Sequence, residues 1–221
     1  MIKDEVFKKR VVLCVVGVVL SGVAVSFFKS AVFGVDPFQA LMSGLDALIP
    51  IKYGTLYVIV NAVLLLFSLV FDRTRIGLGT LINLFLLGYI VQFGVDVIAA
   101  AVPAPSLAVR VVYLAVGVFI ACVAGSMYFT ADMGVSTYDA IALIITGTWG
   151  KGQFRYVRIM TDFSCVALGV ALFLLSGEKP AGLAAVVGIG TIISAFMMGP
   201  MIDWFNRKLF GPMLHGNGGA E

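Results

Sequence analysis

The sequence predicts an all-α membrane protein with six transmembrane helices and two short helices, arranged as two internal repeats. First, 61% of the residues are hydrophobic and 12% are charged, whereas a soluble domain carries about 25% charged residues. Second, residues 11–41 align with residues 111–141 without a gap and match at twelve positions, Gly17/Gly117 among them. Third, several uncharged runs approach the length that crosses about 30 Å of hydrocarbon.

The first repeat is expected over residues 11–101, after a cytoplasmic N-terminal segment at 1–10. That segment carries Lys3, Lys8, Lys9 and Arg10, and positive charge is retained on the cytoplasmic side of a membrane. Pro50 ends the short apolar segment that follows the first span, and Asp72 follows the end of the second span. The spans expected in this repeat are 11–31, 53–71 and 77–101, with a short helix at 36–49.

The second repeat is expected over residues 107–205, because Pro103-Ala104-Pro105 is a poor helix sequence and marks a seam between the halves. A cytoplasmic tail at 206–221 follows and begins with Arg207 and Lys208 after Asn206. The spans expected in this repeat are 107–129, 154–176 and 181–205, with a short helix at 136–149.

The two short helices decide the topology. Fourteen helical residues reach only about 20 Å, less than the thickness of the hydrocarbon core. In the first copy Gln39, Ser43 and Asp46 share one face, opposite an apolar face, so the helix is amphipathic. Such a helix lies at the interface or is re-entrant and lines a protein-enclosed cavity. Each half would then have three full spans. Because three is an odd number, the second repeat would begin on the opposite side of the membrane from the first, and the two repeats would be inverted.

The charge distribution agrees with this topology but does not select it. Six spans place eleven of the fifteen Lys and Arg residues on the cytoplasmic side, as the positive-inside rule expects. An arrangement of eight spans, in which both short helices cross, gives the same count. Helix length favours six.

The starts of the short helices are the first candidate sites. Asp36 and Gln39 in one copy, and Ser136 and Asp139 in the other, follow the capping-box pattern in which a polar side chain satisfies free N–H groups. One interpretation is that both helix N-termini face a shared cavity and offer an anion site. The other is that these residues only cap their own helices.

Arg155, Arg158 and Asp162 are the second candidate site. Their spacing places them on one helix face, with Arg158 within reach of Asp162 at i+4. A carboxylate inside a span is costly unless it is paired or hydrated, so Asp162 is a candidate for proton or substrate relay. Asn61 occupies the matching position of the first repeat. The alternative is a topology anchor with one structural ion pair.

The Gly-x-Gly-Thr segments at 77–80 and 188–191 are interpreted as helix-packing sites, since small residues let helix backbones approach closely.

His215, the only histidine, lies in a glycine-rich tail, which excludes a Ser–His pair within the bilayer and a histidine metal cluster. We therefore expect no enzymatic activity, metal or cofactor. The expected partners are the lipid bilayer and a small-molecule solute, not nucleic acid; a homo-oligomer is left open.

The run at 131–140, Ala-Asp-Met-Gly-Val-Ser-Thr-Tyr-Asp-Ala, resembles a segment of the YczE/YitT-type bacterial membrane proteins. Arg155, Arg158 and Asp162, and the closing helix with Gly-Ile-Gly-Thr at 188–191, resemble that family as well. The resemblance implies a multi-pass protein of the bacterial inner (plasma) membrane, in a family often suspected of transport. Gly54 and Tyr57 replace the two arginines in the first half, so the halves are not equivalent.

These observations favour a secondary carrier for a small polar or anionic solute, with proton coupling through Asp162 as an option. Duplicated halves around a central site are typical of such carriers. The alternatives are a passive channel and a substrate-binding or assembly subunit of a larger membrane complex.

Overall fold

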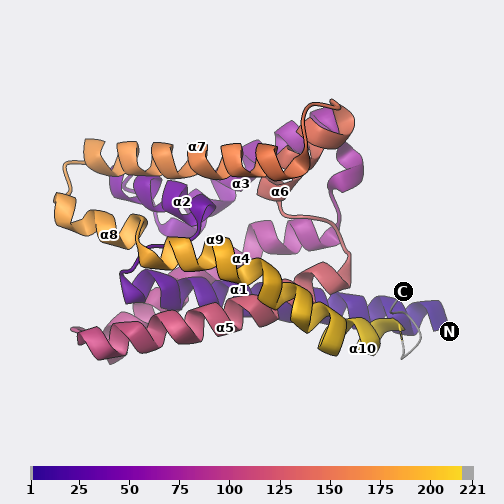
Figure 1. Ribbon diagram of the computed structural model, residues 1–221, viewed down its shortest axis with the longest axis horizontal. Helices are drawn as coiled ribbons and strands as arrows, with labels where there is room; N and C mark the ends of the chain where they lie inside the picture. The colour runs from indigo at the N-terminus through magenta and orange to yellow at the C-terminus, as the bar shows by residue number, and fades with distance from the viewer. Residues whose placement is uncertain (1, 216–221) are drawn as a thin grey trace.

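The computed structural model describes residues 2–215 of the chain, and its ends come close together. Within that range the side chains of residues 2–4, 155, 181, 195, 196, 199, 214 and 215 are not described. All the regular elements of the described residues are helices, and they form an elongated bundle (Figure 1). The predicted all-α class is therefore confirmed.

The first half of the chain forms four helices and one short turn. They are α1 (Ile2–Ala31), α2 (Pro37–Leu48), α3 (Tyr53–Phe71), the 3₁₀ turn η1 (Arg73–Arg75) and α4 (Leu78–Ala101). The second half is more broken. It contains α5 (Leu107–Ala131), α6 (Thr137–Leu143), the π-helical turn η2 (Ile144–Thr148), α7 (Phe154–Leu175), the 3₁₀ turn η3 (Pro180–Gly182), α8 (Leu183–Val186), α9 (Ile189–Phe205), the π-helical turn η4 (Asn206–Phe210) and α10 (Gly211–His215).

Five helices of the described chain are long and apolar enough to cross a membrane: α1, α3, α4, α5 and α7. The sixth predicted span, 181–205, is instead divided into α8 and α9 at Val187 and Gly188. Gly188 causes the break, because its N–H bonds to the Thr191 hydroxyl (3.2 Å) rather than to a helical carbonyl. A Cβ on Gly188 would lie 2.4 Å from the carbonyl oxygen of Phe33, so only glycine fits.

Helices α1 and α5 run antiparallel and form the centre of one layer. A Cβ on Gly17 would lie 3.1 Å from the carbonyl oxygen of Ala124, and a Cβ on Gly117 would lie 3.3 Å from that of Ala24. The two glycines therefore let the backbones approach closely, as small residues do between membrane helices. The pairing extends to the helix ends, where Arg10 bonds to Asp132 (3.4 Å).

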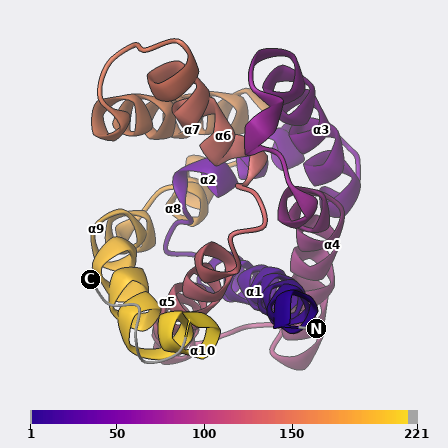
Figure 2. The ribbon, with the colours of Figure 1, turned by 90° about the vertical axis from the view of Figure 1, so that its right-hand side faces the viewer.

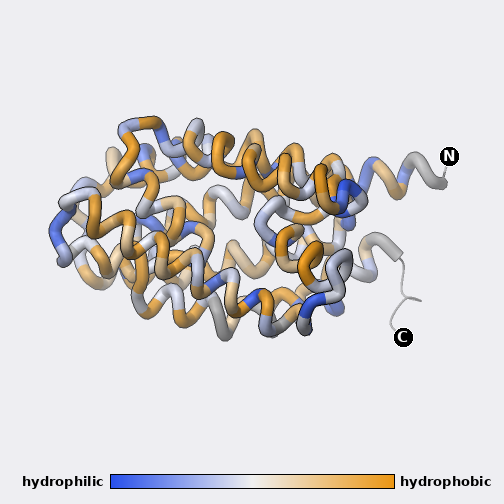
Figure 3. Tube along the Cα trace, turned by 90° about the horizontal axis from the view of Figure 1, so that it is seen from above, coloured by the Kyte–Doolittle hydropathy of each residue, from blue (hydrophilic) through white to orange (hydrophobic). Residues whose placement is uncertain are grey.

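The remaining helices surround this pair. Helix α4 packs on α1 and α9 packs on α5, while α2, α3, α6 and α7 form a second layer (Figure 2). Apolar residues follow the long helices, and hydrophilic segments gather toward the two ends of the molecule (Figure 3). Many large apolar side chains face outward, including Val70, Phe93, Phe163 and Leu175. Such an outer surface suits hydrocarbon and not water.

The two short helices begin near each other in the interior and lead toward opposite ends of the bundle (Figure 1). Helix α2 is enclosed by protein, since Ala40 and Met42 are fully buried and a Cβ on Gly44 would overlap the carbonyl group of Gly169 on α7. The chain after α6 reaches the end of the bundle where Thr148 donates a hydrogen bond to Asp72 (2.7 Å). That end, which carries Arg10, Arg73, Arg75 and Lys151, is called the basic end below.

The chain breaks in the two halves make matching contacts. The N–H of Gly79 donates to the carbonyl oxygen of Met133 (2.8 Å), and the N–H of Gly190 donates to that of Phe33 (2.7 Å). Gly79 and Gly190 occupy equivalent positions of the two Gly-x-Gly-Thr segments, and Met133 and Phe33 are equivalent in the gapless alignment. Each half thus supplies the carbonyl oxygen that accepts a hydrogen bond from the glycine N–H of the other half.

Candidate functional site

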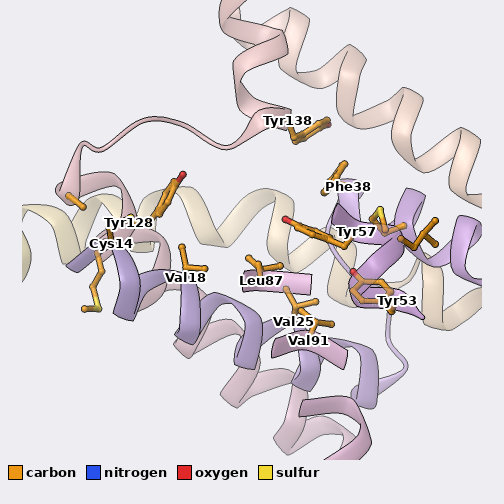
Figure 4. Close-up of a cluster of buried hydrophobic side chains, with 14 of the residues drawn as sticks. Cys14, Val18, Val25, Phe38, Tyr53, Tyr57, Leu87, Val91, Tyr128 and Tyr138 are labelled. Carbon is orange, nitrogen blue, oxygen red and sulfur yellow. The ribbon is translucent and has the colours of Figure 1, made fainter. Parts of the chain in front are cut away.

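The N-termini of α2 and α6 meet in the middle of the bundle. The rings of Phe38 and Tyr138, each the second residue of its helix, stack with centroids 5.0 Å apart (Figure 4). Stacked rings at this separation are mutually attractive. The polar residues that begin the two helices are thereby brought close to one another.

Both helix starts are capped as the sequence predicts. The N–H of Gln39 donates to the carboxylate of Asp36 (3.1 Å), and the N–H of Asp139 donates to the hydroxyl of Ser136 (3.1 Å). The Ser136 hydroxyl in turn donates to the Asp139 carboxylate (2.7 Å). Each cap satisfies an N–H group that a helix otherwise leaves open. Capping is therefore one role of these residues, and a role in binding stays a prediction.

Arg158 of α7 is the centre of the charged cluster. It bonds to the carboxylate of Asp139 on α6, and its Nε lies 3.2 Å from the carboxylate of Asp162. The Tyr138 hydroxyl donates to the same oxygen of Asp162 (2.5 Å), while the guanidinium lies 4.5 Å from the centroid of the Tyr138 ring. The predicted i+4 pair is confirmed. We name these four residues, Tyr138, Asp139, Arg158 and Asp162, the central cluster.

The charges of the central cluster are partly accessible. The side chains of Arg158, Asp139 and Asp162 are 32%, 25% and 30% exposed. One guanidinium faces two carboxylates, which leaves an excess negative charge. The central cluster is therefore not fully enclosed by the protein.

Asn61, Thr137 and Tyr57 join α3 to the start of α6. The Thr137 hydroxyl donates to the Asn61 side-chain oxygen (2.5 Å), and the Asn61 amide donates to the carbonyl oxygen of Tyr57 (2.8 Å). Asn61 is 2% exposed. It stands where the second half has Asp162, and both accept a hydrogen bond from the beginning of α6. The structure therefore places Asn61, buried, beside the central cluster.

Gln39 belongs to a neighbouring polar group on α2. It is buried and accepts a hydrogen bond from the Tyr53 hydroxyl. Lys29 lies 3.6 Å from the centroid of the Tyr53 ring and 3.7 Å from the Asp46 carboxylate. This arrangement fixes the polar face of α2 inside the protein, where the sequence left open an interfacial position.

A cavity of about 410 Å³ opens between α2, α3, α6 and α7. It is lined mainly by apolar side chains, with Tyr138, Thr161 and Ser164 as polar exceptions. Tyr138 belongs both to this cavity and to the central cluster. An apolar chamber with a few convergent polar groups has the composition of a small-molecule site.

Of the eight predicted site residues, the structure brings Ser136, Asp139, Arg158 and Asp162 into direct contact, and Asn61 through Thr137. Asp36 and Gln39 lie at the adjoining start of α2. The side chain of Arg155 lies outside the described residues. Sequence reasoning did not single out Tyr138, Thr137 and Tyr53, although Tyr138 stands beside Asp139 in the run at 131–140.

The profile of a family described as "Family of unknown function (DUF6198)" matches residues 8–207. An uncharacterized protein of Haemophilus influenzae is 26% identical over 60% of this chain, which spans 54% of that protein. The uncharacterized protein YyaS of Bacillus subtilis is 23% identical over 86% of the chain and 89% of its own length. The uncharacterized membrane protein YczE of the same organism is 22% identical, with shares of 83% and 79%.

No solved structure matches the chain. The family profile and the similarity to YczE confirm the resemblance to the YczE-type membrane proteins.

Proposed function

We propose that this chain, which belongs to the DUF6198 family of membrane proteins, is a secondary carrier for a small polar or anionic solute in the inner membrane. The observation that carries the proposal is the position of the central cluster. Arg158 and its two carboxylates lie where the N-termini of α2 and α6 meet, and carriers built from two halves bind their solutes at such a midpoint.

Six spans and an inverted repeat are part of this proposal, with α8 and α9 together forming the sixth, broken span. The antiparallel packing of α1 and α5 supports opposite orientations of the halves, because these helices hold the duplicated sequence. The matching contacts of Gly79 and Gly190 support a twofold relation. Helices broken at membrane depth are tolerated where they line an interior cavity. Both chain ends then lie in the cytoplasm.

The chemistry of the cluster suits coupling to protons. Protonation of Asp162 would remove one of the two negative charges that hold Arg158, so the guanidinium could turn to an anionic group of the solute. Release of the proton would restore the pair and expel the solute. A charge-assisted contact of this kind is strong enough to order a ligand, and weak enough to exchange once the competing carboxylate is ionised again.

The test uses proteoliposomes loaded with the pH-sensitive dye pyranine and a panel of small amino acids, carboxylates and phosphates. We expect at least one solute to cause saturable acidification of the lumen, and Asp162→Asn to abolish it while the protein remains folded. Asp203→Asn is the matched control, because Asp203 forms an exposed i+4 pair with Arg207 (3.4 Å).

One further outcome would reject the role of the central cluster, and two would reject the carrier itself. Equal transport by wild type and Asp162→Asn would assign the central cluster to structure alone. Single-channel currents without saturation would indicate a pore. Co-purification with an ATPase, without transport by the isolated protein, would indicate a subunit of a larger complex.

A further inference from the structure

A second cavity, of about 420 Å³, lies at the basic end, apart from the central cluster. It is bounded by η1, by the C-terminal turn of α5 and by the loop that leads to α6. Its lining includes Tyr128, Arg75, Asp132 and Thr74, so its wall is far more polar than that of the first cavity. The transport proposal above assigns no role to these residues.

Tyr128 carries an unused hydrogen-bonding group. Its side chain is 9% exposed, and its hydroxyl has no hydrogen-bond partner among the described residues. The hydroxyl points away from Cys14 and Val18 toward the loop that precedes Tyr138 (Figure 4). A buried hydroxyl without a partner is destabilising, and native structures rarely retain one unless a ligand or water satisfies it.

The carboxylates beside the cavity already have partners. Asp132 bonds to Arg10. Asp72 accepts from the hydroxyls of Thr74 (2.5 Å) and Thr148 (2.7 Å), and these bonds hold the pKa of Asp72 at about 2. Asp72 therefore remains ionised and occupied at neutral pH. Asp72 and Asp132 each have a partner, although the Asp132 side chain is 81% exposed, whereas the Tyr128 hydroxyl has none among the described residues.

Arg75 supplies a positive charge to the same wall. Its Nε lies 3.3 Å from Asp72. Arg75 is one of the residues that line the cavity, and one of its terminal amino groups lies beside Gly147 of η2. A tyrosine hydroxyl and a guanidinium on one cavity wall are the donors that bind carboxylate and phosphate oxygens in proteins.

The opposite end of the molecule shows that the fold does not require these polar groups. There Phe28, Val32 and Val186 stand where the basic end has Tyr128, Asp132 and Arg75. The backbone is nevertheless built alike, because Val35 N–H donates to the carbonyl of Val186 (3.4 Å) as Val135 N–H donates to that of Arg75 (3.3 Å). Phe28 and Val186 are buried in an apolar cluster. The matching backbone at the opposite end is thus built without a tyrosine hydroxyl or a guanidinium in these positions.

We propose that the cavity at the basic end is a binding site for a small oxyanion, a carboxylate or a phosphate group, held by the hydroxyl of Tyr128 and the guanidinium of Arg75. The same chemistry is offered by a free metabolite and by the headgroup of an anionic lipid. None of the four residues of the central cluster lines this cavity, and the proposal does not depend on whether the protein transports a solute.

The test measures the thermal unfolding midpoint of the protein in maltoside micelles, which contain neither group. Sodium phosphate, sodium acetate and phosphatidylglycerol are added separately at matched ionic strength, with sodium chloride as the baseline. We expect phosphate or acetate to raise the midpoint, as a ligand that binds only the folded state does. Tyr128→Phe should weaken that ligand's affinity roughly tenfold to a hundredfold.

Tyr113→Phe is the matched control, since Tyr113 lies on the same helix and packs on Phe27. It should respond like the wild type. A response to phosphatidylglycerol alone, lost in Tyr128→Phe, would identify the oxyanion as a lipid headgroup. No response in the wild type, or an undiminished response in Tyr128→Phe, would overturn the proposal. Tyr128→Phe should fold, because Phe28 fills the matching place.

Discussion

Arg158 connects side chains from two helices, and its contacts differ in how far the sequence reveals them. The pair with Asp162 follows from helical spacing alone, because residues four apart share a face. The bonds to Asp139 and from Tyr138 to Asp162 join residues 19 and 24 positions apart. Those bonds depend on how α6 packs on α7, and no local pattern in the sequence states that packing. The caps at Asp36 and Ser136 were predictable for the same reason as the i+4 pair.

At this scale we predict that Tyr138→Phe lowers the free energy of unfolding by about 1.5 kcal/mol, the lower part of the range for a hydrogen bond to a charged group. Because Asp162 is 30% exposed, water compensates part of the loss. The stack on Phe38 is retained, so the change reports the hydroxyl alone. Denaturant unfolding in micelles measures it.

A double-mutant cycle assigns that loss to the right partner. In an Asp162→Asn background the additional effect of Tyr138→Phe should fall to a few tenths of a kcal/mol, since the charged acceptor is already gone. Additive effects of the two substitutions would show that the Tyr138 hydroxyl stabilises the protein through another contact.

At the scale of helices, hydrophobic length predicts the bounds of α3, α4, α5 and α7 well, whereas α1 begins at Ile2 and not at the expected residue 11. The structure begins and ends α3 at Tyr53 and Phe71, as expected, and α4, α5 and α7 differ from the prediction by at most two residues at an end. The prediction of an unbroken span at 181–205 was too simple. Its break lies at Gly188, which packs closely on Phe33, more than 150 positions away in the chain, and composition does not show that packing. The π-helical end of the second short helix was missed as well.

The enclosed position of α2 leads to a prediction for Gly169 of α7. A Cβ at Gly169 would lie 2.4 Å from the carbonyl oxygen of Ala40, which belongs to the helix backbone and has little room to move. Gly169→Ala should therefore separate α2 from α7 and lower the free energy of unfolding by about 1–3 kcal/mol. The thermal midpoint in micelles checks this expectation.

Gly125→Ala is the control for helix propensity and size. A Cβ at Gly125 meets only the side chain of Ile202, at 3.0 Å, and that flexible tip can turn aside. This variant should unfold within about 1 kcal/mol of the wild type, or slightly later, since alanine favours a helix over glycine. A Gly169→Ala protein as stable as Gly125→Ala would show that α2 is not held tightly on α7.

At the scale of the whole molecule, the proposed six spans make a definite prediction of sidedness. Single cysteines replace Lys9, Lys52 and Arg73 in a chain whose buried Cys14, Cys122 and Cys165 are changed to alanine. An impermeant maleimide applied to right-side-out vesicles should label position 52 and spare positions 9 and 73. Eight spans would reverse the result, with 73 labelled and 52 protected. Inside-out vesicles supply the complementary pattern.

The Phe38–Tyr138 stack bears on the proposed duplication, because the two rings occupy matching positions when residues 11–41 are aligned with residues 111–141. Under the proposed twofold relation, a protein encoded by a single ancestral copy would bring this aromatic ring against its own duplicate in a homodimer. Its subunits would have to insert both ways up in the same membrane. In that scheme the two joined halves are free to differ, as Tyr57 differs from Arg158 at the matching position.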